Sequence, residues 1–297
     1  MTNNLNTTES RLSLLKIVLF TIACILIFVL IAVICDLLTF WIPSTVPKIV
    51  LRELVLRMPL TIYALHVFAG RVIKTYNPGV IYGKLSLVNV LKWTAISIIL
   101  PAVVWLFYYL FGFAVPFGHS ASFSAADGWG ILVKWLAISI AAGFTEEVLF
   151  RGHLLMIISS RGSTLWTIFV TSLIFGIVHI AMLSSFGAID ILTVVGGGII
   201  AGTMFACIYW YTRSVWYAAI VHTVWDIFFI GKITTIAVSQ TDANLAIAAF
   251  KLTTKSRLLT GGSFGLETGL PCFIVYVLVV IVIARIHRPT TNKLMSQ

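Results

Sequence analysis

The sequence predicts an all-α fold, a polytopic membrane bundle of about eight transmembrane helices. The 297-residue chain is 60% hydrophobic and only 10% charged, and its mean hydropathy is +1.05. A soluble domain of similar length carries about 25% charged residues. Apolar runs long enough to cross a bilayer follow one another along the chain, and no internal repeat is visible.

Each expected span is an apolar run bounded by polar or turn-forming residues. The ranges are roughly 15–36, 49–72, 88–115, 130–160, 163–183, 188–212, 214–231 and 268–286. The first lacks a small-residue cleavage site, so we expect an uncleaved helix there. The second is the least apolar, because Arg52, Glu53 and Arg57 interrupt it and Pro59 bends it.

Three regions follow from these spans. Residues 1–129 hold the N-terminal accessory helices, residues 130–231 a helical core that carries the polar motifs described below, and residues 232–297 an extramembrane loop and the last helix. Lys232 to Gly269 is the only long stretch with no expected span. Within it, the Ala-rich run from Asn244 to Phe250 suggests a short surface helix.

The formal net charge of +10 fits membrane orientation and contact with anionic lipids. Basic residues gather in the loops that lie on one side if both termini are cytoplasmic, so we expect a multi-pass membrane protein with that orientation. We expect its location to be a prokaryotic cell membrane, which the charge pattern itself does not specify. Membrane lipids are therefore expected partners. A nucleic-acid partner is not expected, because the chain lacks a basic soluble face. The four cysteines show no metal-ligand spacing, and nothing in the sequence specifies an oligomeric state.

The first of three polar constellations is Glu146, Glu147 and Arg151, within an otherwise apolar run. Residues four apart share a helix face, so Glu147 and Arg151 can pair, whereas Glu146 points elsewhere. A carboxylate in apolar surroundings suits a general base. The alternative interpretation is a structural ion pair with a buried acid.

The second constellation is Phe175 and His179, near the end of the next span. Glu146 lies about 15 residues before an expected turn at Arg161 and Gly162, and His179 lies about 17 after it. At about 1.5 Å per residue, the two levels differ by about 3 Å, so both side chains can share one water. Taken alone, a histidine on an apolar face is usually a satisfied core residue, and only the shared level with Glu146 favours a catalytic role for His179.

The third constellation is His222 and Asp226, four residues apart on one face, where the carboxylate can fix the imidazole tautomer. It could also merely lock two helices together. Small residues accompany these motifs, and we expect them to allow close helix packing. They are Gly176, Gly196, Gly197, Gly198 and Gly202.

Together, these motifs resemble the CPBP family. That family comprises CAAX proteases and bacteriocin-processing (Abi) enzymes, among them Rce1-type endopeptidases. The resemblance rests on Glu-Glu-x-x-x-Arg at Glu146, Glu147 and Arg151, Phe-x-x-x-His at Phe175 and His179, and His-x-x-x-Asp at His222 and Asp226. All three occur in order within roughly residues 130–231.

The resemblance implies an α-helical intramembrane endopeptidase that hydrolyses a peptide bond with a glutamate. Glu146 and His179 would activate a water, His222 and Asp226 would stabilise the oxyanion, and Glu147, Arg151 and Phe175 would support them. Many such enzymes carry Asn where this chain has Asp226. Either a protonated Asp226 donates to the oxyanion, or Asp226 orients a charged His222 that donates. The substrate would be a peptide or protein, including membrane-attached ones, and no cofactor is implied.

Three alternatives use the same residues. A zinc metalloprotease would bind its metal through His179, His222 and Glu146, although these lack the His-Glu-x-x-His arrangement. A proton-coupled transporter would use Glu146, Glu147 and His179 as a relay, but the expected second copy of such a segment is missing. An immunity scaffold would bind a partner and leave the motifs unused.

Overall fold

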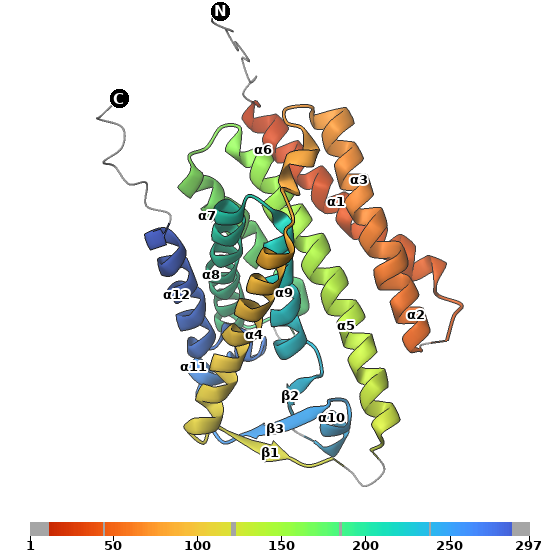
Figure 1. Ribbon diagram of the computed structural model, residues 1–297, viewed down its shortest axis with the longest axis vertical. Helices are drawn as coiled ribbons and strands as arrows, with labels where there is room; N and C mark the ends of the chain where they lie inside the picture. The colour runs from red at the N-terminus through yellow and green to blue at the C-terminus, as the bar shows by residue number, and fades with distance from the viewer. Residues whose placement is uncertain (1–11, 44, 120–122, 184–185, 238, 287–297) are drawn as a thin grey trace, which may run out of the picture.

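The protein is a bundle of helices with a small sheet at one end (Figure 1). The computed structural model describes residues 12–43, 45–119, 123–183, 186–237 and 239–286. Within these ranges, each of the expected spans contains a helix. The all-α prediction is therefore confirmed.

The first half of the chain supplies the helices that flank the predicted core. They are α1 (Leu14–Leu38), α2 (Val46–Val50), η1 (Leu51–Arg57), α3 (Met58–Phe68), η2 (Ala69–Ile73), η3 (Pro78–Ile81) and α4 (Leu87–Leu110). η1 and η2 are π-helical, and α2, η1, α3 and η2 run on without a break.

The predicted core and the C-terminal part supply the remaining helices. They are α5 (Ala125–Glu147), η4 (Val148–Leu154), α6 (Leu155–Ser159), α7 (Thr164–Val178), η5 (His179–Met182), α8 (Ala188–Thr212), α9 (Val215–Phe229), α10 (Gln240–Asn244), α11 (Arg257–Thr260), η6 (Leu266–Thr268) and α12 (Leu270–Ile286). α5, η4 and α6 form one continuous rod with a π-helical middle.

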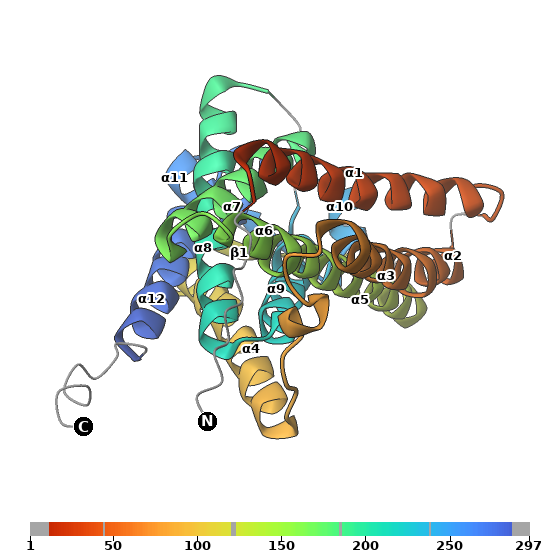
Figure 2. The ribbon, with the colours of Figure 1, turned by 90° about the horizontal axis from the view of Figure 1, so that it is seen from above.

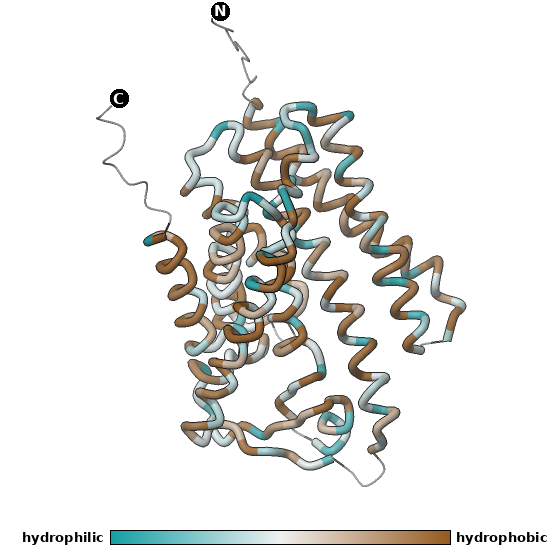
Figure 3. Tube along the Cα trace, in the orientation of Figure 1, coloured by the Kyte–Doolittle hydropathy of each residue, from teal (hydrophilic) through white to brown (hydrophobic). Residues whose placement is uncertain are grey.

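Five of these rods are long and apolar enough to cross a membrane. They are Leu14–Leu38, Leu87–Leu110, Ala125–Ser159, Thr164–Met182 and Ala188–Thr212. α9 and α12 are apolar but shorter. Hydrophobic residues continue onto the outside of the bundle, as the mostly brown α12 illustrates (Figure 3), which suits a surface that faces lipid.

The helix expected between Asn244 and Phe250 does not form. α10 ends at Asn244, and the residues that follow enter strand β3 (Ala248–Leu252). β3 pairs antiparallel with β1 (Ala114–Phe117) and parallel with β2 (Thr234–Ile236). Alanine favours helix in isolation, but here strand pairing and the burial of Ala249 beside Phe117 outweigh that preference.

Close helix contacts place α7, α8 and α9 at the middle of the bundle (Figure 2). A Cβ on Gly198 of α8 would lie 2.3 Å from the Gly176 Cα of α7, and one on Gly143 of α5 would lie 2.5 Å from the Thr223 hydroxyl of α9. Neither crossing leaves room for a side chain. Gly202 also packs against α7, but Gly196 has nothing within 4 Å, so the expectation of close packing was wrong for Gly196.

Candidate active site

The candidate site begins where α5 becomes π-helical. Glu146 and Glu147 are the last residues of α5, and every residue of η4 is buried. A π-turn inside an α-helix is uncommon and often accompanies a functional site. It changes which side chains share a face immediately after the acid pair.

Glu147 is the centre of a buried chain of polar contacts. Its Oε1 accepts a hydrogen bond from the Arg151 guanidinium at 2.8 Å and another from His222 Nδ1, also at 2.8 Å. Since an ionised carboxylate can only accept, His222 Nδ1 carries a proton in this arrangement. Glu147 therefore joins α5 to α9 and fixes the orientation of the His222 ring.

Arg151 is enclosed completely, with a side chain that is only 1% exposed. Besides Glu147, its guanidinium donates to the Gly202 carbonyl oxygen at 3.2 Å. Its Cζ also lies 4.3 Å from the Phe175 ring centroid and 5.1 Å from that of Phe205. These contacts compensate a charge that would otherwise be costly to bury.

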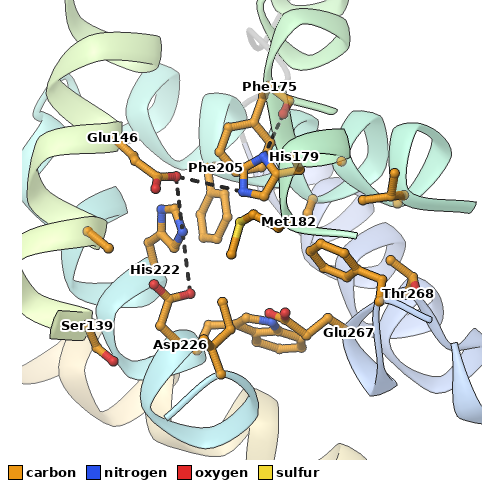
Figure 4. Close-up of a pocket in the computed structure, with 18 of the residues that line it drawn as sticks. Ser139, Glu146, Phe175, His179, Met182, Phe205, His222, Asp226, Glu267 and Thr268 are labelled. Carbon is orange, nitrogen blue, oxygen red and sulfur yellow. Dashed lines mark hydrogen bonds and ion pairs between the residues drawn. The ribbon is translucent and has the colours of Figure 1, made fainter. Parts of the chain in front are cut away.

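Glu146 faces the other way, towards two imidazoles (Figure 4). Its Oε2 lies 3.9 Å from His179 Nε2 and 3.9 Å from His222 Nε2. Both separations are too long for a direct hydrogen bond. Among the described residues, this oxygen has no hydrogen-bond partner. The gap between Glu146 and His179 has the size that one bridging water fills.

His179 is held with its reactive nitrogen towards Glu146. It begins η5 at the end of α7, and its Nδ1 lies 2.6 Å from the Phe175 carbonyl oxygen. A carbonyl can only accept, so the Nδ1 of His179 donates, and the neutral ring presents the lone pair of Nε2 to the gap. The Phe175 ring lies against the His179 ring, 4.3 Å between centroids, which limits its rotation.

Asp226 is the remaining member of the predicted set. Its Oδ1 lies 3.5 Å from His222 Nε2, so the closer partner of His222 is Glu147. The Phe205 ring stacks on the other side of His222, with centroids 4.6 Å apart. His222 is thus held by acids at both ring nitrogens and by an aromatic face.

These side chains surround a cavity of about 270 Å³. Glu146, Phe175, His179, His222 and Asp226 all line it, while Glu147 and Arg151 lie behind the lining. The remaining walls are mainly apolar. They include Ile138, Ala142, Val194, Ala201, Ile230 and Phe264. The structure thus brings together the predicted residues from α5, α7, η5 and α9.

Five lining residues lie outside the predicted region of 130–231: Arg57, Phe264, Glu267, Thr268 and Tyr276. Sequence reasoning assigned Glu267 no role, because no ionisable residue lies at helical spacing from it. It also did not find Phe205, an aromatic residue in α8 without a distinguishing pattern. The division into three regions stays a prediction, since the cavity draws on all three.

No three His, Cys, Asp or Glu side chains within the described ranges are arranged to hold a metal ion. Zinc requires ligand atoms about 2.0–2.2 Å from the metal in near-tetrahedral geometry, and hence about 3.4 Å from one another. The 3.9 Å separations around Glu146 are wider than that. The zinc alternative therefore stays a prediction, in which Glu146, His179 and His222 would have to move closer together to hold the ion.

Comparison with protein families finds a match within the helical core. Residues 128–228 match the family model described as type II CAAX prenyl endopeptidase Rce1-like. Searches of curated proteins and of solved structures found no match. The matched range contains all of the motifs from Glu146 to Asp226 and all but the first residues of α5 and the last of α9, as expected for an integral membrane protease domain. Residues 128–228, about a third of the chain, are therefore similar to the Rce1-like type II CAAX prenyl endopeptidases.

Proposed function

We propose that the protein is an intramembrane endopeptidase in which Glu146 and His179 activate a water that attacks a peptide bond. The observation that carries this proposal is the 3.9 Å gap between Glu146 Oε2 and His179 Nε2. A water in that gap donates one hydrogen to each acceptor, so its lone pairs face the cavity. Loss of a proton to either acceptor then leaves a hydroxide-like nucleophile.

The carbonyl oxygen of the scissile bond gains negative charge as the water attacks. His222 Nε2 borders the same cavity, and with a proton on this nitrogen it is a donor for that oxygen. Glu147 favours the positively charged ring by accepting from Nδ1 at 2.8 Å. Asp226, 3.5 Å from Nε2, adds to this effect when ionised, or donates a second hydrogen bond when protonated.

The leaving amine requires a proton, and the acid formed on Glu146 or His179 supplies it. The same pair thus acts first as base and then as acid, and the reaction balances without an external reagent. The apolar walls of the cavity strengthen these electrostatic interactions because they exclude bulk water. Peptides and proteins, including membrane-attached ones, are the proposed substrates.

Substitution of Glu146 and of His179 tests the proposal. We expect Glu146→Gln and His179→Ala to lower the cleavage rate by a factor of about 10² to 10⁴, the usual contribution of general acid–base catalysis. Substrates are identified by comparing the new peptide termini in membranes that contain the wild-type protein with those in membranes that contain Glu146→Gln. Cleavage rates on these substrates are then measured with the purified proteins in detergent.

Asp127→Asn is the matched control, because Asp127 is an acidic residue at the start of α5, far along the helix from Glu146. Size-exclusion and thermal-unfolding profiles check that each variant is folded. Undiminished cleavage by both site variants would exclude the mechanism. Metal analysis of an active preparation separates it from the zinc alternative, in which His179, His222 and Glu146 would be ligands.

A further inference from the structure

A second cavity adjoins the catalytic one. It has a volume of about 140 Å³ and is lined by Met182, Phe229, Ile230, Phe264, Gly265, Leu266 and Glu267. Met182, Ile230, Phe264 and Glu267 line both cavities, so the two meet at these side chains. We call the smaller one the side cavity. Its size suits one amino-acid side chain.

Glu267 is the only charged side chain among the described residues that line the side cavity. Figure 4 shows it across the main cavity from Glu146, with its carboxyl group directed inward. The other walls are aromatic or aliphatic, or contain thioether sulfur. An acid at the end of an apolar cavity complements a side chain that has an apolar stem and a cationic end.

The loop that carries Glu267 is fixed in place. Gly261 has a φ of 72°, and a Cβ there would lie 1.7 Å from the Gly265 carbonyl oxygen. The Thr268 hydroxyl donates to the Gly261 carbonyl at 2.8 Å, and the Tyr276 hydroxyl donates to the Glu267 carbonyl at 3.3 Å. Glu267 is therefore positioned before any substrate arrives, which favours selective binding.

We infer that the side cavity is a specificity subsite, in which Glu267 binds a basic side chain of the peptide near the bond to be cut. This inference rests on the proposed function, because it assigns the subsite to that reaction. The charge balance supports it. Glu146, Asp226 and Glu267 border the main cavity, whereas Arg57 is the one permanent cation among its described lining residues.

The ionisation of Glu267 makes the subsite sensitive to pH. Burial raises the pKa of Glu267 from 4.5 to about 7, and nearby His222 opposes this rise. The carboxyl group is therefore mostly neutral below pH 7 and anionic above it, so the preference for a basic side chain should increase as the pH rises through 7. The titratable or charged groups around Glu267 are Arg57, Glu146, His179, His222, Asp226, Cys272 and Tyr276.

Paired peptides test the subsite. Quenched-fluorescence peptides carry lysine, arginine, norleucine or glutamate at each position around the cleavage site. Norleucine keeps the apolar stem of lysine but lacks the charge. At the peptide position that enters the side cavity, we expect wild type at pH 8 to have a kcat/KM for the lysine peptide about tenfold above that for the norleucine peptide. A well-placed ion pair of about 1.4 kcal/mol would give this ratio.

The ratio of kcat/KM for the lysine peptide to that for the norleucine peptide cancels any effect of pH on the catalytic groups, because both peptides depend on those groups equally. We expect it to fall towards one between pH 8 and pH 6 in wild type, and to stay near one at every pH in Glu267→Gln. Asp127→Asn should behave like wild type. The pH series of wild type needs no variant, so a poorly folded Glu267→Gln protein would not obscure the result.

Equal rates for lysine and norleucine at every position, or a preference that Glu267→Gln retains, would overturn the subsite while cleavage itself persists. Absence of any cleavage by wild type would instead contradict the proposed function. In that case, competition between the same peptides for photo-crosslinking to the protein tests the subsite without catalysis: tighter binding of the lysine peptide supports it, and equal binding overturns it.

Discussion

At the scale of single residues, one carboxylate oxygen joins the structural and chemical parts of the site. Glu147 Oε1 accepts from both Arg151 and His222. Glu147 is fully buried, and Arg151 nearly so. Removing one partner of such a pair leaves an uncompensated charge, whereas removing both does not.

Arg151→Met should therefore lower the free energy of unfolding by about 3–5 kcal/mol. The double variant Glu147→Gln/Arg151→Met should recover much of this loss, because it buries no isolated charge. It should nevertheless cleave poorly, since His222 loses its ionised acceptor. Unfolding in mixed detergent micelles measures the stabilities. A single variant as stable as wild type would show that the pair contributes nothing to the fold.

Sequence spacing predicted two of the pairings in the site and missed the closest partner of His222. The i,i+4 rule led to the pairing of Glu147 with Arg151, and hairpin arithmetic led to that of Glu146 with His179. The closest partner of His222 is Glu147 on another helix, where the sequence suggested Asp226. The rotation of α9 about its axis decides this, and no local pattern encodes it. Glu267 was missed for the same reason, because only the tertiary fold brings its loop to the cavity.

At the scale of elements, the crossing of α7 and α8 sets the position of His179. The two backbones touch at Gly176 and Gly198, and His179 follows α7 directly. Any widening of this crossing moves the imidazole relative to Glu146. Misplacement of a catalytic group by about 1 Å can lower a rate about 10²-fold.

Gly198→Ala should accordingly destabilise the protein by about 1–3 kcal/mol through overpacking and reduce cleavage at least about tenfold. Gly196→Ala is the matched control on the same helix, since nothing lies within 4 Å of its added Cβ, and it should leave both properties close to wild type. Thermal unfolding and initial rates measure the two effects. Equal behaviour of the two variants would contradict a role for the crossing.

Elements with strong periodicity or long apolar runs were predictable, and those that depend on distant pairing were not. Each expected span contains a helix because hydrophobicity over about 20 residues is a local property. Strand β3 lies in an Ala-rich run and is held as a strand by β2 on one side and on the other by β1, which lies more than 130 residues earlier. The π-helical turns likewise left no signal in the residue pattern.

At the scale of the whole molecule, α4 separates two loops that the charge pattern assigns to opposite sides of the membrane. The loop with Lys84 lies just before α4. Strand β1 lies just after α4 and pairs with β3, and Lys255 follows β3 by three residues. The positive-inside rule puts the Lys84 loop in the cytoplasm. The loop with Lys255 would then face the other side, together with the small sheet.

Single cysteines at these positions test the orientation. In a background without Cys24, Cys35, Cys207 and Cys272, we expect Lys255→Cys to react with a membrane-impermeant maleimide in intact cells. Lys84→Cys should react only after the cells are permeabilised. Both side chains are exposed in the fold, so access depends on the membrane alone. The reverse labelling pattern would invert the orientation.

The π-helical stretch η4 restricts how the length of this chain can vary. Val148–Leu154 links the acid pair to α6, which packs beside α7. Each residue added to or removed from that stretch would turn the rest of the rod by about 100° and detach α6 from its neighbour. Gaps in alignments with related sequences should therefore fall in the loops and avoid this stretch, even where the amino acids within it differ.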